Sequence, residues 1–143
     1  MQHHWSVLCQ SSVIDIDSNL LSLYDCLEEL NVNTPLKPGQ PINLPISFEV
    51  VSFLSDSNLK TERKIELKAE MIDPKGEKIN EFGGQLFFKD GSKRLRSRLK
   101  IQGLKLSDPG TYIMHISFQG LDGLDFKAEC DLPLDVNISY KLM

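Results

Sequence analysis

Short runs of alternating apolar and polar residues, separated by turn residues, make up most of this 143-residue chain. In residues 63–72, Ile65, Leu67 and Met71 alternate with charged residues, and residues 124–132 alternate in the same way. An alternation of period two puts the apolar side chains on one face of a β-strand, and no apolar stripe of helical period exceeds about two turns. The pattern predicts an all-β fold of about eight or nine strands.

Prolines and other residues that favour turns separate these runs. Asp73-Pro74-Lys75-Gly76 predicts a tight hairpin turn, and residues 119–123 predict a glycine-rich hairpin loop. Residues 31–45 contain four prolines and a glycine. Because proline cannot donate a backbone hydrogen bond, we expect residues 31–45 to be an irregular crossing segment outside the sheets.

Residues 20–30 allow two interpretations. Turn chemistry over residues 15–19 followed by an apolar run predicts a second strand that pairs with residues 5–14 in an N-terminal hairpin. Leu20, Leu23 and Leu27 also fall at helical spacing, so a short helix is the alternative. The strand is the preferred interpretation.

Asp108-Pro109-Gly110-Thr111-Tyr112 resembles the tyrosine corner of immunoglobulin-like domains, in which a tyrosine hydroxyl bonds back to the chain just upstream. The resemblance assigns structural roles to Asp108, Gly110 and Tyr112. Together with the strand pattern, it predicts a two-sheet immunoglobulin-like antiparallel β-sandwich in a single domain covering residues 1–143. Met114 stands where antibody-type domains carry a cysteine, so we expect the core to be held by packing.

Other short motifs resemble a known family. Leu8-Cys9-Gln10 leads through the Asp17-Ser18-Asn19 turn into the apolar residues 20–25, and the Asp-Pro-Lys-Gly hairpin and a Pro-Gly-x-Tyr element follow. This layout is similar to that of a group of small uncharacterised bacterial β-sandwich proteins. In that group a Leu-Cys-Asp strand leads through a Gly-Lys-Leu turn into an apolar strand. The resemblance implies a β-sandwich of unknown function and carries over no catalytic residue.

The composition is that of a globular protein, with 41% hydrophobic and 25% charged residues and a net charge of -4. No run approaches the roughly 18 apolar residues that a membrane-spanning helix requires. The first residues lack a secretory pattern, and the three cysteines are an odd, scattered set. We therefore expect a cytoplasmic protein without membrane contact, whose free thiols pack in the core.

Basic residues concentrate in one predicted strand. Arg94, Arg96, Arg98 and Lys100 alternate with apolar or small residues, which puts the four charges on one face, roughly 6.6–7 Å apart. This spacing is close to that of successive phosphates in a nucleic acid strand. The net acidity and the lack of neighbouring aromatic residues make nucleic acid an unlikely partner. A solvated face paired with acidic neighbours, or a charged edge strand, is the preferred interpretation.

Catalytic and metal-binding patterns are weak. A Cys9–His115 or Cys130–His115 pair is a conceivable nucleophile and base, but cysteines on apolar strands are more often core residues. Asp15-x-Asp17-x-Asn19 alternates oxygen ligands but lacks the glycine and glutamate of a calcium loop, so a plain turn is favoured. We expect no enzyme activity, no metal and no cofactor.

These observations favour a non-enzymatic binding or scaffold module. Recognition is expected in the loops at 31–45, 55–62 and 119–123, or at an exposed edge strand, with another protein or a second copy of the chain as the partner. The alternative is binding of a polyanion or single-stranded nucleic acid by the basic strand.

Overall fold

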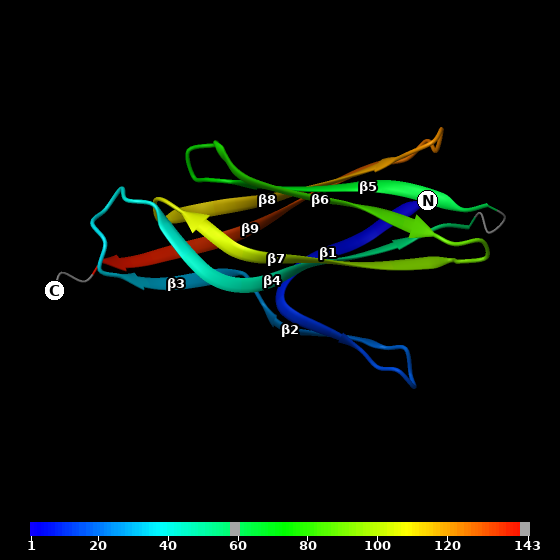
Figure 1. Ribbon diagram of the computed structural model, residues 1–143, viewed down its shortest axis with the longest axis horizontal. Coiled ribbons are helices and arrows are strands. Elements are labelled where there is room, and N and C mark those ends of the chain that lie inside the picture. Colours follow the sequence, from blue (N-terminus) through cyan, green and yellow to red (C-terminus); the bar gives the residue numbers. More distant parts are fainter. Residues whose placement is uncertain (58–60, 141–143) are drawn as a thin grey trace.

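The computed structural model describes residues 1–57 and 61–140, which form nine β-strands and no helix (Figure 1). The strands are β1 (Gln2–Ile14), β2 (Leu21–Cys26), β3 (Glu29–Thr34), β4 (Ile42–Ser55), β5 (Arg63–Ile72), β6 (Lys78–Phe88), β7 (Arg94–Leu106), β8 (Gly110–Gly120) and β9 (Lys127–Tyr140). The expected all-β fold is confirmed for this part of the chain. None of these residues belongs to a helix that could cross a bilayer.

The strands make two sheets. The order in the four-stranded sheet is β2-β1-β4-β7, and the order in the five-stranded sheet is β3-β9-β8-β5-β6. Side chains of both sheets form one hydrophobic cluster, to which β4 contributes Phe48 and Val50 and β8 contributes Tyr112 and Phe118. The immunoglobulin-like arrangement of these sheets remains a prediction.

The alternation seen in the sequence decides which side chains enter this cluster. In β5, Ile65, Leu67 and Met71 are buried, whereas the charged residues between them reach the other face. In β4 the apolar residues change parity, and Val51 is buried on the face opposite the cluster. Burial on both faces of β4 accounts for the change.

The predicted strand after the first turn is confirmed, and the helix alternative is wrong. β2 pairs with β1, and the chain then crosses to the other sheet within two residues: Leu27 N–H donates to the Leu8 carbonyl, and the Glu28 carbonyl accepts from Asp135 N–H. The apolar residues of this segment belong to two different sheets. Their helical spacing in the sequence therefore does not correspond to one face of a helix.

The expectation of purely antiparallel sheets is wrong at one position. β3 runs parallel to β9, with Glu29 opposite Asp135 and Thr34 opposite Tyr140. The cause is the crossing at residues 27–28, because the chain changes sheets there without turning back. β3 becomes an edge strand beside the last strand of the chain.

The expected irregular segment at residues 31–45 is shorter than predicted. β3 extends to Thr34 and β4 begins at Ile42, so only residues 35–41 lie outside the strands. Pro45 is tolerated within β4 because the pairing with β7 shifts register between Leu44 and Ser47. Of the loop expected at 55–62, residues 58–60 lie outside the described residues.

Candidate functional site

The predicted basic strand is β7, an edge strand of the four-stranded sheet. Arg94, Arg98 and Lys100 are exposed and Arg96 is half-buried, all on the face opposite the hydrophobic cluster. The structure therefore brings the four basic residues together on one outer face, as the spacing indicates. Lys100 lies opposite the buried Glu49 of β4 in the ladder.

Two of these arginines bind the chain's own backbone. Arg96 Nη2 donates to the Asn19 carbonyl at 2.6 Å, and Arg98 Nη1 donates to the Ser12 carbonyl at 3.4 Å. Both acceptors belong to the β1–β2 hairpin. This use of the basic strand was not visible in the sequence, because the arginines are separated from their acceptors by more than 70 residues.

The arm, defined as residues 10–26, is the part of the β1–β2 hairpin beyond Cys9, the last β1 residue that pairs with β4. It diverges from the other strands of the four-stranded sheet toward its tip (Figure 1). Its two faces differ in exposure. Ser12, Ile14, Leu21 and Leu23 are half-buried, whereas Ser11, Val13, Ser22 and Tyr24 are exposed.

Apolar side chains gather on the exposed surface of the arm. Of the seven large apolar side chains that are exposed in the described residues, four lie on the arm: Val13, Ile16, Leu20 and Tyr24. Ile16 is 98% exposed and Leu20 is 68% exposed. Scattered exposed apolar residues are ordinary, but a group on a projecting hairpin is typical of an interaction surface. The hairpin is predicted by the sequence pattern, but this surface is not.

The turn at the tip of the arm is held by Asp15. Its Oδ1 accepts the backbone N–H groups of Asp17 and Ser18, both at 2.8 Å. These hydrogen bonds, first that from Ser18, lower the pKa of the Asp15 carboxyl. Asn19 adopts a φ of 58°, a conformation that asparagine tolerates. The favoured interpretation of this motif as a turn is confirmed, since the carboxylate accepts from the turn backbone.

The arm is also acidic and offers a free strand edge. It contains Asp15, Asp17 and Asp25 and no lysine or arginine. In the described structure β2 pairs only with β1, so the backbone groups along its other edge have no strand partner. β2 carries neither the lysine nor the proline with which proteins commonly protect such edges.

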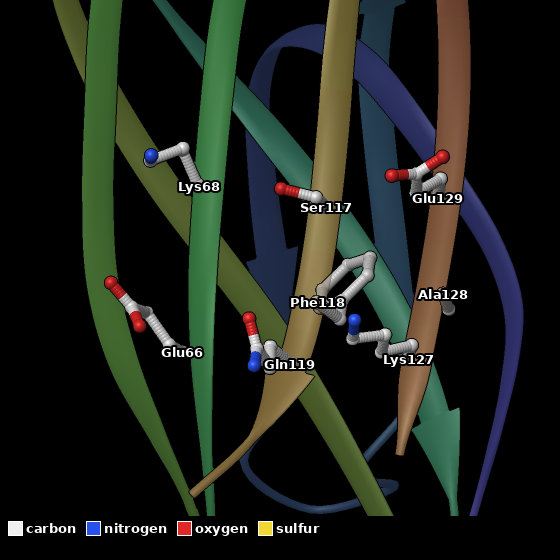
Figure 2. Close-up of a pocket in the computed structure, with 8 residues that line it drawn as sticks. All are labelled: Glu66, Lys68, Ser117, Phe118, Gln119, Lys127, Ala128 and Glu129. Carbon is white, nitrogen blue, oxygen red and sulfur yellow. The ribbon is translucent and has the colours of Figure 1, made fainter.

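A second surface lies on the outer face of the five-stranded sheet. A hollow of about 560 Å³ is lined there by charged and polar side chains from β5, β8 and β9 (Figure 2). On the same sheet Lys68 Nζ lies 3.2 Å from a Glu81 carboxylate oxygen, and Lys78 Nζ lies 2.9 Å from the other. Oppositely charged side chains thus pair with one another on this outer face, which is typical of a solvated sheet face.

The considered cysteine–histidine pairs do not form. Cys9 belongs to the four-stranded sheet, whereas His115 lies on the outer face of the five-stranded sheet beside Asp131. Cys130 is opposite Ile116 in the ladder, on the other face from His115. Burial raises the pKa of Cys130 and raises that of Cys9 to about 11, so neither thiol is activated. The described residues hold no cluster of three metal-ligating side chains.

The expectation that all three cysteines pack in the core is wrong for Cys26. Cys9 is fully buried and Cys130 is half-buried, but Cys26 is exposed. The reason is the position of Cys26 at the end of edge strand β2, where the chain leaves one sheet for the other.

Tyr112 of the predicted corner motif bonds back to the chain just upstream of it. The buried Tyr112 donates its hydroxyl hydrogen to the Asp108 carbonyl at 2.7 Å and accepts from Ser107 N–H at 3.1 Å. Gly110 has a φ of 141°, and a Cβ there would lie 2.9 Å from Pro74 Cγ. These contacts lie at the start of β8.

No protein-family model and no curated protein matches this chain. Among solved structures, it is similar to a family 123 glycoside hydrolase from Clostridium perfringens that was studied for the hydrolysis of glycolipid glycans. The TM-score is 0.43 and the sequence identity 14%, over 84% of this chain and 24% of the other. The chain therefore spans about a quarter of the length of that enzyme chain. A likeness this weak supports no conclusion about fold or function.

Proposed function

We propose that this chain is a non-enzymatic protein-recognition module and that the arm, residues 10–26, is its contact surface. The observation that carries the proposal is the group of exposed apolar side chains on the arm, Val13, Ile16, Leu20 and Tyr24. A projecting hairpin with an apolar tip can insert between groups of a partner while the two sheets hold its base in place.

The free edge of β2 suggests how the partner binds. An extended segment of another protein can add to β2 as a further strand, with its backbone hydrogen bonds to the edge giving affinity. Because the arm carries Asp15, Asp17 and Asp25 without a basic residue, the matching segment is basic as well as apolar.

The proposal extends to the fold, which we propose is an immunoglobulin-like sandwich. In such domains the strand with the corner tyrosine lies between two neighbours of its own sheet. β8, which starts at the Tyr112 corner, lies between β5 and β9 in the same way, while β4 and β7 are neighbours in the other sheet. The arm arises because β1 continues beyond Cys9, its last pair with β4, and pairs there with β2.

Polyanion binding by the basic strand has less support. Arg96 and Arg98 already donate to backbone carbonyls of the arm, which leaves Arg94 and Lys100 as the exposed cations of the stripe that the arm does not engage in the described structure. Three exposed charges on an acidic protein, one of them engaged by the arm, give a weak, strongly salt-dependent attraction for phosphates.

The test compares the proteins retained from lysate by three immobilised chains: the wild type, the double variant I16S/L20S and the control F87S. Phe87 is 47% exposed on β6, remote from the arm in sequence and in sheet. We expect a specific protein to be retained by the wild type and by F87S and to be lost with I16S/L20S. Binding of the purified partner must then reproduce this order. An identical set of proteins on all three chains would contradict the proposal.

A further inference from the structure

Cys9 and Cys26 face each other across the first hairpin. They are direct partners in the antiparallel ladder of β1 and β2. Directly opposite residues point their side chains to the same face of a sheet, so the two thiols are neighbours. This pairing was not visible in the sequence, where both cysteines were expected as separate core residues.

The backbone hydrogen bonds around Cys9 and Cys26 show whether they form a hydrogen-bonded or a non-hydrogen-bonded pair of the antiparallel ladder. Leu27 N–H donates to the Leu8 carbonyl at 2.8 Å, so the bonds between the strands lie outside Cys9 and Cys26. The two cysteines thus form a non-hydrogen-bonded pair, in which the Cα atoms lie about 4.5 Å apart. That separation is within the range of roughly 4.4–6.8 Å that a disulfide bond spans.

The two thiols differ in access to solvent. Cys9 is fully buried, whereas Cys26 is exposed and lines a hollow of about 410 Å³ between β1 and β9. Burial, and then the neighbouring Glu49 carboxylate, raise the pKa of Cys9. A small reagent can therefore reach Cys26 first, and Cys9 is placed to react second.

We infer that Cys9 and Cys26 form a reversible cross-strand disulfide that fastens the base of the arm. The bond would join the buried end of the hairpin to the point where the chain leaves β2. It closes residues 10–25 into a loop, which includes the whole apolar surface of the arm. This inference does not depend on the arm binding a partner.

The bond forms in two thiol–disulfide exchange steps with a small disulfide, such as glutathione disulfide, as the oxidant. The Cys26 thiolate attacks one sulfur of the small disulfide, whose S–S bond breaks, and a mixed disulfide forms at Cys26. Cys9 Sγ then attacks Cys26 Sγ and the second small thiolate leaves. Each leaving thiolate takes up the proton that the attacking cysteine loses. The two cysteines are oxidised and the small disulfide is reduced to two thiols.

The experiment uses the full chain with C130S, which leaves only the two facing cysteines. The protein is treated with glutathione disulfide, its intact mass is measured, and its free thiols are titrated. We expect the mass to fall by two hydrogen atoms, both thiols to disappear, and dithiothreitol to restore them. The oxidised chain should remain a monomer and should melt at a higher temperature than the reduced chain, because the crosslink restricts the unfolded state.

Two further variants assign the order of the steps. C9S/C130S should stop at a lasting glutathione adduct on Cys26, and C26S/C130S should keep its single buried thiol free. A C130S chain that retains both thiols, keeps a glutathione adduct, or forms disulfide-linked dimers would overturn the inference. Because C130S alone gives that answer, the test does not depend on the folding of variants at the buried Cys9.

Discussion

Single side chains hold the corner at the start of β8. The Tyr112 hydroxyl is bonded to both the Asp108 carbonyl and the Ser107 N–H, and the ring is fully buried. Y112F removes both hydrogen bonds while keeping the ring, so we expect it to lower the free energy of unfolding by about 1–3 kcal/mol. Urea denaturation measures the loss.

Y24F is the matched control, because Tyr24 is half-exposed on the arm. Its effect should be within about 0.5 kcal/mol of zero. Equal stabilities for Y112F and the wild type would show that the two hydrogen bonds contribute nothing to the corner.

The backbone conformation and close surroundings of Gly110, near the start of β8, favour glycine at this position. Gly110 combines a φ of 141° with a close approach to Pro74, whose Cγ would lie 2.9 Å from an added Cβ. We expect G110A to destabilise the chain by about 1–3 kcal/mol through this strain. G84A is the control, since Gly84 has no atom within 4 Å of an added Cβ. Thermal unfolding of the two variants tests the account, which predicts that only G110A melts earlier.

The turn of the arm should respond to acid through Asp15. Backbone N–H groups hold its pKa below the ordinary value of 3.8, so the folded turn binds this proton less readily than the unfolded chain does. The stabilisation is complete above pH 3.8 and is lost as the pH falls through the lowered pKa. The amide resonances of Asp17 and Ser18 should therefore shift with a midpoint below 3.8. A midpoint at or above that value would contradict the assignment of these hydrogen bonds.

At the scale of elements, the arm is oriented by the basic strand. Arg96 and Arg98 link it to β7 through hydrogen bonds to the Asn19 and Ser12 carbonyls. We expect R96A/R98A to leave the sheets folded and to speed amide hydrogen exchange in the arm. R94A, which removes an exposed arginine of the same strand, should leave that exchange unchanged. Equal exchange rates in the arm of all three chains would show that the arginines do not hold it.

The alternating pattern of the sequence predicted some strands of this fold but not how they pair. Alternation indicates which face of a strand is buried, and it was sufficient for β5, β8 and residues 127–132 of β9, whereas residues 124–126, which continue the same alternation, lie outside the strand. It does not indicate the neighbouring strand. The parallel pairing of β3 with β9 and the crossing at residues 27–28 therefore had no signal in the local sequence.

The candidate site, too, could be predicted only in part from local alternation. The spacing of Arg94, Arg96, Arg98 and Lys100 correctly placed the four side chains on one face. The carbonyls that Arg96 and Arg98 bind come from another part of the chain, and backbone acceptors leave no trace in residue types. The apolar arm was missed because Ile16 lies in the turn and Leu20 just after it, and the sequence does not show whether another element covers them.

For the whole molecule, the charge distribution decides between the two proposed classes of partner. A chain with a net charge of -4 and three exposed basic-strand cations, of which Arg98 already donates to the arm, should bind single-stranded DNA weakly at low salt. We expect R94E/K100E to change fluorescence-anisotropy binding curves little. Tight binding by the wild type that this double variant abolishes would favour the polyanion alternative.

Strand addition of an extended basic segment to β2 of the arm can be measured by amide hydrogen exchange across β2. The probes are a peptide of alternating lysine and valine and its counterpart of alternating glutamate and valine. We expect the lysine peptide to slow exchange at residues 21–26, the glutamate peptide to do so far less, and I16S/L20S to weaken the effect. Unchanged exchange in β2 at saturating lysine peptide, or equal protection by the two peptides, would contradict this strand addition.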